Sequence, residues 1–80
     1  IIDVREKEEF EEFSLRGSVS IPLSIISNTK SIDLIKKNFS EKKIYTICQK
    51  GQRSENASRI LMEKDIESIS IKGGIEEIKD

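Results

Sequence analysis

The sequence predicts an α/β fold in which a doubly wound parallel sheet has helices on both faces. Short segments rich in β-branched and apolar residues recur along the 80 residues, segments with helical patterning separate them, and the connections are short. Right-handed crossovers between parallel strands would place helices on both faces of the sheet. The length suits a single domain over residues 1–80 with a modest buried core.

The first two strands are expected near the start of the chain, on either side of a helix. Residues 1–4 form a short apolar run with one aspartate, which is typical of a buried strand. Residues 6–15 are rich in glutamate and predict a helix with a solvated face, which Gly17 ends. Residues 18–21 predict a brief second strand that stops at Pro22.

The middle of the chain predicts a second helix and then the most strongly patterned strand. The helix is expected over residues 31–39, with either Asn28 or Ser31 as its N-cap. Residues 43–47 are β-branched and aromatic, which predicts a strand.

The last third of the chain repeats the same alternation. A helix is expected to follow Ser54, which can serve as its N-cap. Residues 66–71 alternate apolar and polar side chains and predict another strand. Gly73 and Gly74 predict a turn, and residues 75–80 predict a final helical turn.

The composition excludes several classes of protein. The 14 basic and 15 acidic side chains give a net charge of -1, which offers no support for nucleic-acid or membrane-surface binding. No apolar run approaches the ~20 residues of a membrane span. One cysteine rules out an internal disulfide, and the absence of histidine removes both the usual general base and the commonest metal ligand. A lone thiol suits a reducing compartment, so we expect a cytoplasmic protein with no metal and no cofactor.

Cys48 lies in the segment with the strongest signal for chemistry. It follows the strand predicted over residues 43–47 and precedes a helix, which places it at the carboxyl edge of the sheet, where ligand sites gather. Loop N–H groups and the helix N-terminus both favour an anion there. Lys50 and Arg53 add positive charge, and Gly51 permits a backbone conformation that a Cβ would resist. We therefore expect this loop to lower the thiol pKa without help from an imidazole.

Four short motifs occur in order along the chain. Residues 2–6 read IDVRE and are followed by Glu9-Phe10; residues 17–23 read GSVSIPL; residues 48–54 read CQKGQRS; and residues 68–78 contain a double glycine. These motifs resemble the ordered landmarks of the rhodanese-like sulfurtransferase family and cover almost the whole chain. The resemblance implies a doubly wound α/β fold with a central parallel sheet. It also implies a cysteine that takes a sulfane sulfur from a donor and passes it to a nucleophilic acceptor.

The resemblance implies a role for each residue of the loop. Cys48 would be the nucleophile and the persulfide carrier. Backbone N–H groups after it would surround the terminal sulfur, while Lys50 and Arg53 would hold an anionic donor or acceptor at the rim. Asp3 and Arg5 match the family's Asp-Val-Arg signature and are expected to brace the site as a polar pair. The expected substrate-binding residues are Gln49, Lys50, Gly51, Gln52, Arg53 and Ser54.

The sequence departs from the family pattern in three respects. Residues 14–17 lack the histidine that the family usually has there, and Ile78 stands in the place of its tryptophan. Most members also carry a strand and a helix before the segment that corresponds to residues 2–6. Because the chain opens on a strand without methionine, we expect it to be a piece of a longer protein and its sheet to lack the usual first strand.

Three other functions fit the same fold. Phosphatase loops generally place five residues between cysteine and arginine, whereas four separate Cys48 from Arg53, and no aspartate is placed as a general acid. A sulfur-relay module of a larger adenylyltransferase would use the same cysteine to serve a ubiquitin-like sulfur carrier. A non-catalytic rhodanese-like binding domain commonly lacks the cysteine. The expected partners are a small anionic donor such as thiosulfate, or a protein persulfide, together with a small-molecule or protein acceptor.

Overall fold

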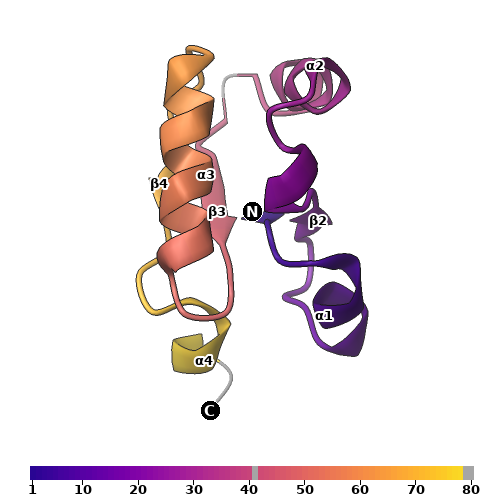
Figure 1. Cartoon of the computed structure of the whole chain (residues 1–80), viewed down its shortest axis with the longest axis vertical. Coiled ribbons are helices and arrows are strands. Elements are labelled where there is room, and N and C mark those ends of the chain that lie inside the picture. Colours follow the sequence, from indigo (N-terminus) through magenta and orange to yellow (C-terminus); the bar gives the residue numbers. More distant parts are fainter. Residues whose placement is uncertain (41, 79–80) are drawn as a thin grey trace.

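Four parallel strands form one sheet, with helices around it (Figure 1). The structure is a computed structural model and describes residues 1–40 and 42–78. The strands lie in the order β2-β1-β3-β4, so the first and third strands along the chain are the central pair. This arrangement confirms the predicted fold class. The strands are β1 (Ile2–Asp3), β2 (Val19–Ser20), β3 (Tyr45–Ile47) and β4 (Ile69–Ser70).

The helices divide between the two ends of the sheet. Figure 1 shows α1, α4 and the loop between β3 and α3 at one end of the molecule, and α2 at the other. The longest helix, α3, packs against β3 and β4 and also contacts the short 3₁₀ helix η1. The helices are α1 (Lys7–Glu12), η1 (Leu23–Ile25), α2 (Thr29–Asn38), α3 (Gln52–Glu63) and α4 (Gly74–Ile78).

The first residues of α2 and α3 show which of the predicted N-cap residues are correct. Helix α2 begins after Asn28, so the first of its two predicted N-caps is correct, and Ser31 is buried inside the helix. Helix α3 begins earlier than predicted because Gly51, in a left-handed conformation with φ of 117°, is its N-cap. Ser54 therefore lies within the first turn of α3, and its predicted role as N-cap is wrong.

The C-terminal segment also differs from its prediction. Gly73 lies in the predicted turn, but Gly74 is already the first residue of α4. The predicted helical turn over residues 75–80 is thus confirmed through Ile78, and residues 79–80 lie outside the described part of the chain.

The core lies between the sheet and the helices and is almost entirely aliphatic. Its buried cluster includes the cysteine, whose exposure is only 1%. Leu23, Phe39 and Ile60 pack against this cluster as partly buried neighbours. The cluster comprises Ile2, Val4, Ile21, Ile26, Ile32, Ile35, Ile44, Cys48, Ala57, Leu61 and Ile66.

Candidate active site

The Cys48 thiol lies at the carboxyl end of β3 and faces the N-terminus of α3. Side chains alternate between the two faces of a strand, so Cys48 shares a face with Thr46, which hydrogen bonds to α3. The backbone N–H groups of Gly51 and Ser54 donate to Cys48 Sγ over 3.0 and 3.3 Å. A sulfur at this position receives main-chain donors and the partial positive charge of the helix N-terminus, both of which favour a thiolate.

The hydroxyl of Ser54 completes the surroundings of the sulfur. Ser54 Oγ lies 3.5 Å from Cys48 Sγ, and Ser54 is fully buried. Burial alone would raise the pKa of the Cys48 thiol, but hydrogen bonds from the Ser54 hydroxyl and from loop N–H groups outweigh it, so the pKa lies below its ordinary value. We call the N–H groups of Gly51 and Ser54, with the Ser54 hydroxyl, the cradle.

A chain of buried and half-buried hydroxyl groups continues from the cradle toward β4. Ser54 Oγ lies 2.6 Å from Ser70 Oγ on β4. Thr46 Oγ1 on β3 donates to the backbone carbonyl of Ser54 and lies 2.9 Å from Ser58 Oγ, which also accepts from Ser68 Oγ. Sequence reasoning missed this cluster, although the alternation within residues 66–71 contained the signal that Ser68 and Ser70 share one face of the strand.

Gly73 and Gly74 lie next to the loop that follows Cys48, and Gly74 lies against its backbone. The N–H groups of Ile75 and Glu76 in α4 donate to the carbonyl groups of Cys48 and Gln49 over 2.8 and 3.1 Å. Gly74 has a positive φ of 63°, and a Cβ there would lie 2.2 Å from the Cys48 carbonyl oxygen and 2.6 Å from that of Gln49. The sequence predicted a turn at this point; the structure shows in addition that glycine is required because the two backbones approach so closely.

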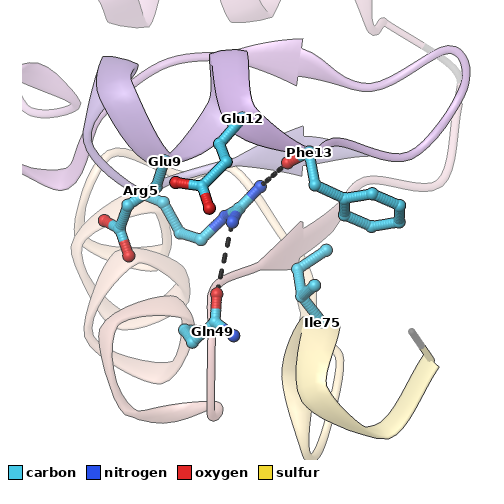
Figure 2. A pocket seen from close by; sticks show the side chains of 6 residues that line it. All are labelled: Arg5, Glu9, Glu12, Phe13, Gln49 and Ile75. Atoms are coloured by element: carbon cyan, nitrogen blue, oxygen red, sulfur yellow. Dashed lines mark hydrogen bonds between the residues drawn. The ribbon is translucent and has the colours of Figure 1, made fainter. Parts of the chain in front are cut away.

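Asp3 and Arg5 form a buried ion pair beside the loop. Their side chains are 0% and 3% exposed, and Arg5 Nη2 lies 2.9 Å from Asp3 Oδ2. Figure 2 shows that the Arg5 guanidinium also reaches the backbone carbonyl of Phe13 and the side chain of Gln49, with 3.2 Å between Arg5 Nη1 and Gln49 Oε1. The pair therefore connects β1, the end of α1 and the residue after Cys48. These contacts border a cavity of about 170 Å³ lined by Arg5, Glu9, Glu12, Phe13, Gln49 and Ile75.

Lys50 and Arg53, which were expected to hold an anion, both line the cavity at Cys48, but Arg53 is already paired with a carboxylate. Arg53 makes a two-pronged ion pair with Glu9 of α1, with N–O distances of 2.7 and 3.0 Å. The hydrogen bonds from Arg53 lower the pKa of Glu9 to about 2. Sequence reasoning missed Glu9 as a site residue because 44 positions separate it from Arg53. A cavity of about 190 Å³ opens at Cys48. We call the other side chains that line it the rim; they are Gln49, Lys50, Gln52 and Arg53.

The described residues offer no alternative centre for metal chemistry or membrane insertion. Among residues 1–40 and 42–78, no three His, Cys, Asp or Glu side chains are grouped so that they could hold a metal ion. None of the described helices is long and apolar enough to cross a membrane.

Comparison with known proteins identifies relatives of this chain. A family model for the rhodanese-like domain matches residues 1–80. The chain is 38% identical over 79 residues to an adenylyltransferase and sulfurtransferase of Meyerozyma guilliermondii, and the match covers 94% of this chain and 19% of that protein. The chain spans about a fifth of the length of the curated adenylyltransferases and sulfurtransferases that it matches.

Solved structures give the same result for the fold. A rhodanese-related protein from Thermoplasma volcanium superposes with a TM-score of 0.79 at 30% identity, covering 95% of this chain and 71% of that one. A rhodanese with anions from E. coli superposes with a TM-score of 0.74 at 26% identity, covering 95% of this chain and 86% of that one.

Proposed function

The chain belongs to the rhodanese-like domain family, and from this premise we propose that it is a sulfurtransferase in which Cys48 carries sulfur as a persulfide. The observation that carries the proposal is the position of Cys48 Sγ, which receives the N–H groups of Gly51 and Ser54 at the start of α3. Hydrogen bonds of this kind favour the thiolate, which is the nucleophilic form of cysteine, and they do so without any histidine.

The proposed cycle has two displacement steps at sulfur. The Cys48 thiolate attacks the sulfane sulfur of the donor, a new S–S bond forms, and the bond between that sulfur and the rest of the donor breaks. The donor leaves with the electron pair; thiosulfate leaves as sulfite. A nucleophilic acceptor then attacks the outer sulfur, and the Cys48 thiolate leaves. Electrons balance without an oxidant or reductant.

The residues around the sulfur have different roles in this cycle. The cradle stabilises the Cys48 thiolate as nucleophile and as leaving group, because its donors point at the sulfur that carries the charge. Lys50 and Arg53 at the rim attract an anionic donor, while Gln49 and Gln52 supply neutral hydrogen-bonding groups. Asp3 holds Arg5 in an ion pair, and Arg5 in turn donates to Gln49; neither Asp3 nor Arg5 lines the cavity at Cys48, so we assign them a supporting role.

Intact-protein mass spectrometry tests the proposal directly. After incubation with thiosulfate we expect the mass to rise by one sulfur atom, and cyanide should remove that atom as thiocyanate. The matched control is Cys48→Ser, which replaces the sole thiol with a hydroxyl of similar size and should gain nothing. Sulfur gain in Cys48→Ser would contradict the assignment.

A second candidate keeps the same chemistry but changes the partners. The relatives named as adenylyltransferase and sulfurtransferase join two activities in one protein, and this chain corresponds to about a fifth of each. On that basis the domain would take sulfur from a protein persulfide and deliver it to a ubiquitin-like sulfur carrier in a reducing, cytoplasmic setting. Loading Cys48 from a persulfidated protein much faster than from thiosulfate would favour this candidate; equal or faster loading from thiosulfate would favour the first.

A further inference from the structure

We infer that Ser70 is a positioning residue for Cys48: its hydroxyl donates to Ser54 Oγ, so that the Ser54 hydroxyl is free to donate to the Cys48 sulfur. The inference rests on the proposed function, because it takes Cys48 as the reacting group. Ser70 lies on β4, and its Oγ is 2.6 Å from Ser54 Oγ. The rhodanese-like loop ends at Ser54, so Ser70 contributes from outside the loop that carries the cysteine.

Counting protons shows why Ser54 needs a second hydroxyl. Ser54 has one hydroxyl proton and three possible acceptors within reach: the Gly51 carbonyl at 3.0 Å, the Cys48 sulfur at 3.5 Å and Ser70 Oγ at 2.6 Å. Our inference makes Ser70 the donor in the third contact, which leaves the Ser54 proton for the other two. When Cys48 is a thiol, its S–H can donate to Ser54 Oγ while Ser54 donates to Gly51. When the thiol proton has left to solvent, Ser54 must turn its proton to the sulfur, and Ser70 then fills the acceptor site on Ser54 Oγ.

The rotation of the Ser54 hydroxyl leaves no buried acceptor without a donor. The Gly51 carbonyl also accepts the N–H of Glu55 over 3.2 Å, so it remains hydrogen bonded after Ser54 turns away. A donor that itself receives a hydrogen bond is polarised and donates more strongly. The Ser70–Ser54 contact therefore stabilises the thiolate more than the thiol.

The orientation of β4 supports a specific role for Ser70. Ser70 pairs with Thr46 across the sheet, and both side chains turn toward α3. Ile69, the neighbouring apolar residue, points the other way and is 52% exposed. A strand normally turns its apolar face to a packed helix, whereas β4 turns its hydroxyl groups inward, where they reach the cysteine loop.

The charged groups around Cys48 do not account for this contact. Ser70 Oγ forms a hydrogen bond with Ser54 Oγ, and no charged side chain among the described residues hydrogen bonds to it. Replacing Ser70 therefore leaves the charges on the elements around the sulfur in place; these are Asp3, Arg5, Glu9, Lys50, Arg53 and Glu55.

The pH dependence of Cys48 alkylation by iodoacetamide tests the inference. Ser70→Thr keeps the hydroxyl and adds a methyl group, and Ser70→Val has nearly the shape of that threonine with a methyl group in place of the hydroxyl. Both residues are suited to a strand. We expect Ser70→Val to shift the alkylation profile to higher pH and to slow alkylation at pH 7 by about threefold, the size of one net hydrogen bond. Ser70→Thr should stay close to the wild type, as should Ser68→Ala, which removes a hydroxyl that contacts Ser58.

The outcomes separate this inference from the proposed function. Equal profiles for the threonine and valine variants would overturn the role of Ser70. Because alkylation needs no sulfur donor, a shifted profile in Ser70→Val would uphold that role even if thiosulfate failed to load Cys48. If Ser70→Val does not fold, Ser70→Ala against Ser70→Thr gives the same comparison.

Discussion

Cys48 Sγ lies among main-chain N–H groups and a buried hydroxyl, whereas the opening above it is surrounded by long, partly exposed side chains. In the cradle, the donors to the sulfur come from Gly51 and the fully buried Ser54. At the rim, Arg53 is about a third exposed and is paired with Glu9, and Lys50 is exposed. Under the proposed function, we expect backbone geometry to set the reactivity of the sulfur and the charged side chains to select the donor that approaches it. Substitutions that reach the cradle should therefore have larger effects than substitutions at the rim.

The largest effect is expected from Gly74→Ala, which should displace the backbone of the loop that carries Cys48. The new Cβ would lie 2.2 Å from the Cys48 carbonyl oxygen, so α4 or the loop must move. We expect sulfur transfer to fall by roughly 10²-fold, because small displacements of a reacting group have effects of that size. The measurement is the rate of thiocyanate formation from thiosulfate and cyanide.

Gly17→Ala is the matched control for that change. Gly17 also has a positive φ of 83°, but a Cβ there meets no atom within 4 Å. We expect a loss of about 1–2 kcal/mol in the free energy of unfolding from backbone strain, with sulfur transfer unchanged. Equal losses of transfer in both glycine variants would show that strain, and not contact with the loop, explains the effect.

The next largest effect is expected from Ser54→Ala, which removes one donor of the cradle. Without the hydroxyl the pKa of Cys48 should rise, because that hydrogen bond is the largest of those that lower it. We expect alkylation at neutral pH to slow by roughly tenfold, as for the loss of a hydrogen bond to a charged group. The rates of variant and wild type should converge at high pH, where both thiols are ionised; a constant ratio at every pH would argue against a pKa effect.

A smaller effect is expected from Arg53→Ala at the rim. The KM for thiosulfate should rise several-fold, since a positive charge at the opening is lost, while alkylation by the neutral reagent iodoacetamide should change little. The free energy of unfolding should change by less than about 1 kcal/mol, because the Arg53–Glu9 pair is partly exposed and screened. An unfolded variant would show that Arg53 is needed for the fold, and equal slowing with both reagents would show that it affects the reactivity of the sulfur and not donor binding alone.

The smallest effect is expected from Glu9→Gln and concerns stability in acid. In the folded protein the pKa of Glu9 is lowered from 4.5 to about 2. A lowered carboxyl pKa stabilises the fold above pH 4.5, and this contribution is lost as the pH falls from 4.5 to 2. Glu9→Gln should flatten the pH dependence of unfolding in that window by less than about 1 kcal/mol, after screening. Glu12→Gln, which removes a charge from the same helix but leaves the Arg53 pair intact, should not flatten it.

The fold and the loop could be predicted from the sequence because both depend on local patterns. Alternation of strands and helices predicted the parallel sheet, and the segment from Cys48 to Ser54 predicted a loop at its carboxyl edge. Gly51 was predicted to permit an unusual backbone conformation, and its φ of 117° shows why. Because of that conformation, α3 begins at Gln52, two residues before Ser54. Ser54 was predicted as the N-cap because serine is a preferred capping residue.

The parts of the site that sequence reasoning missed depend on contacts between distant segments. The pairing of Glu9 with Arg53 follows from how α1 packs beside the loop, and no local pattern encodes it. The contact of Ser70 with Ser54 requires the register between β3 and β4, which places Ser70 beside Thr46. A double glycine reads as a turn in any sequence; only the folded chain shows that Gly74 lies against the carbonyl groups of Cys48 and Gln49.

The close approach of Gly74 to the loop also bears on when the thiol becomes reactive during synthesis. The segment that forms α4 follows Cys48 and α3 along the chain, so it is synthesised after them. We expect the cysteine to be less reactive until Ile75 and Glu76 donate to the carbonyl groups of Cys48 and Gln49, because the loop lacks that support before then. The rate of Cys48 alkylation would then report whether α4 has bound the loop.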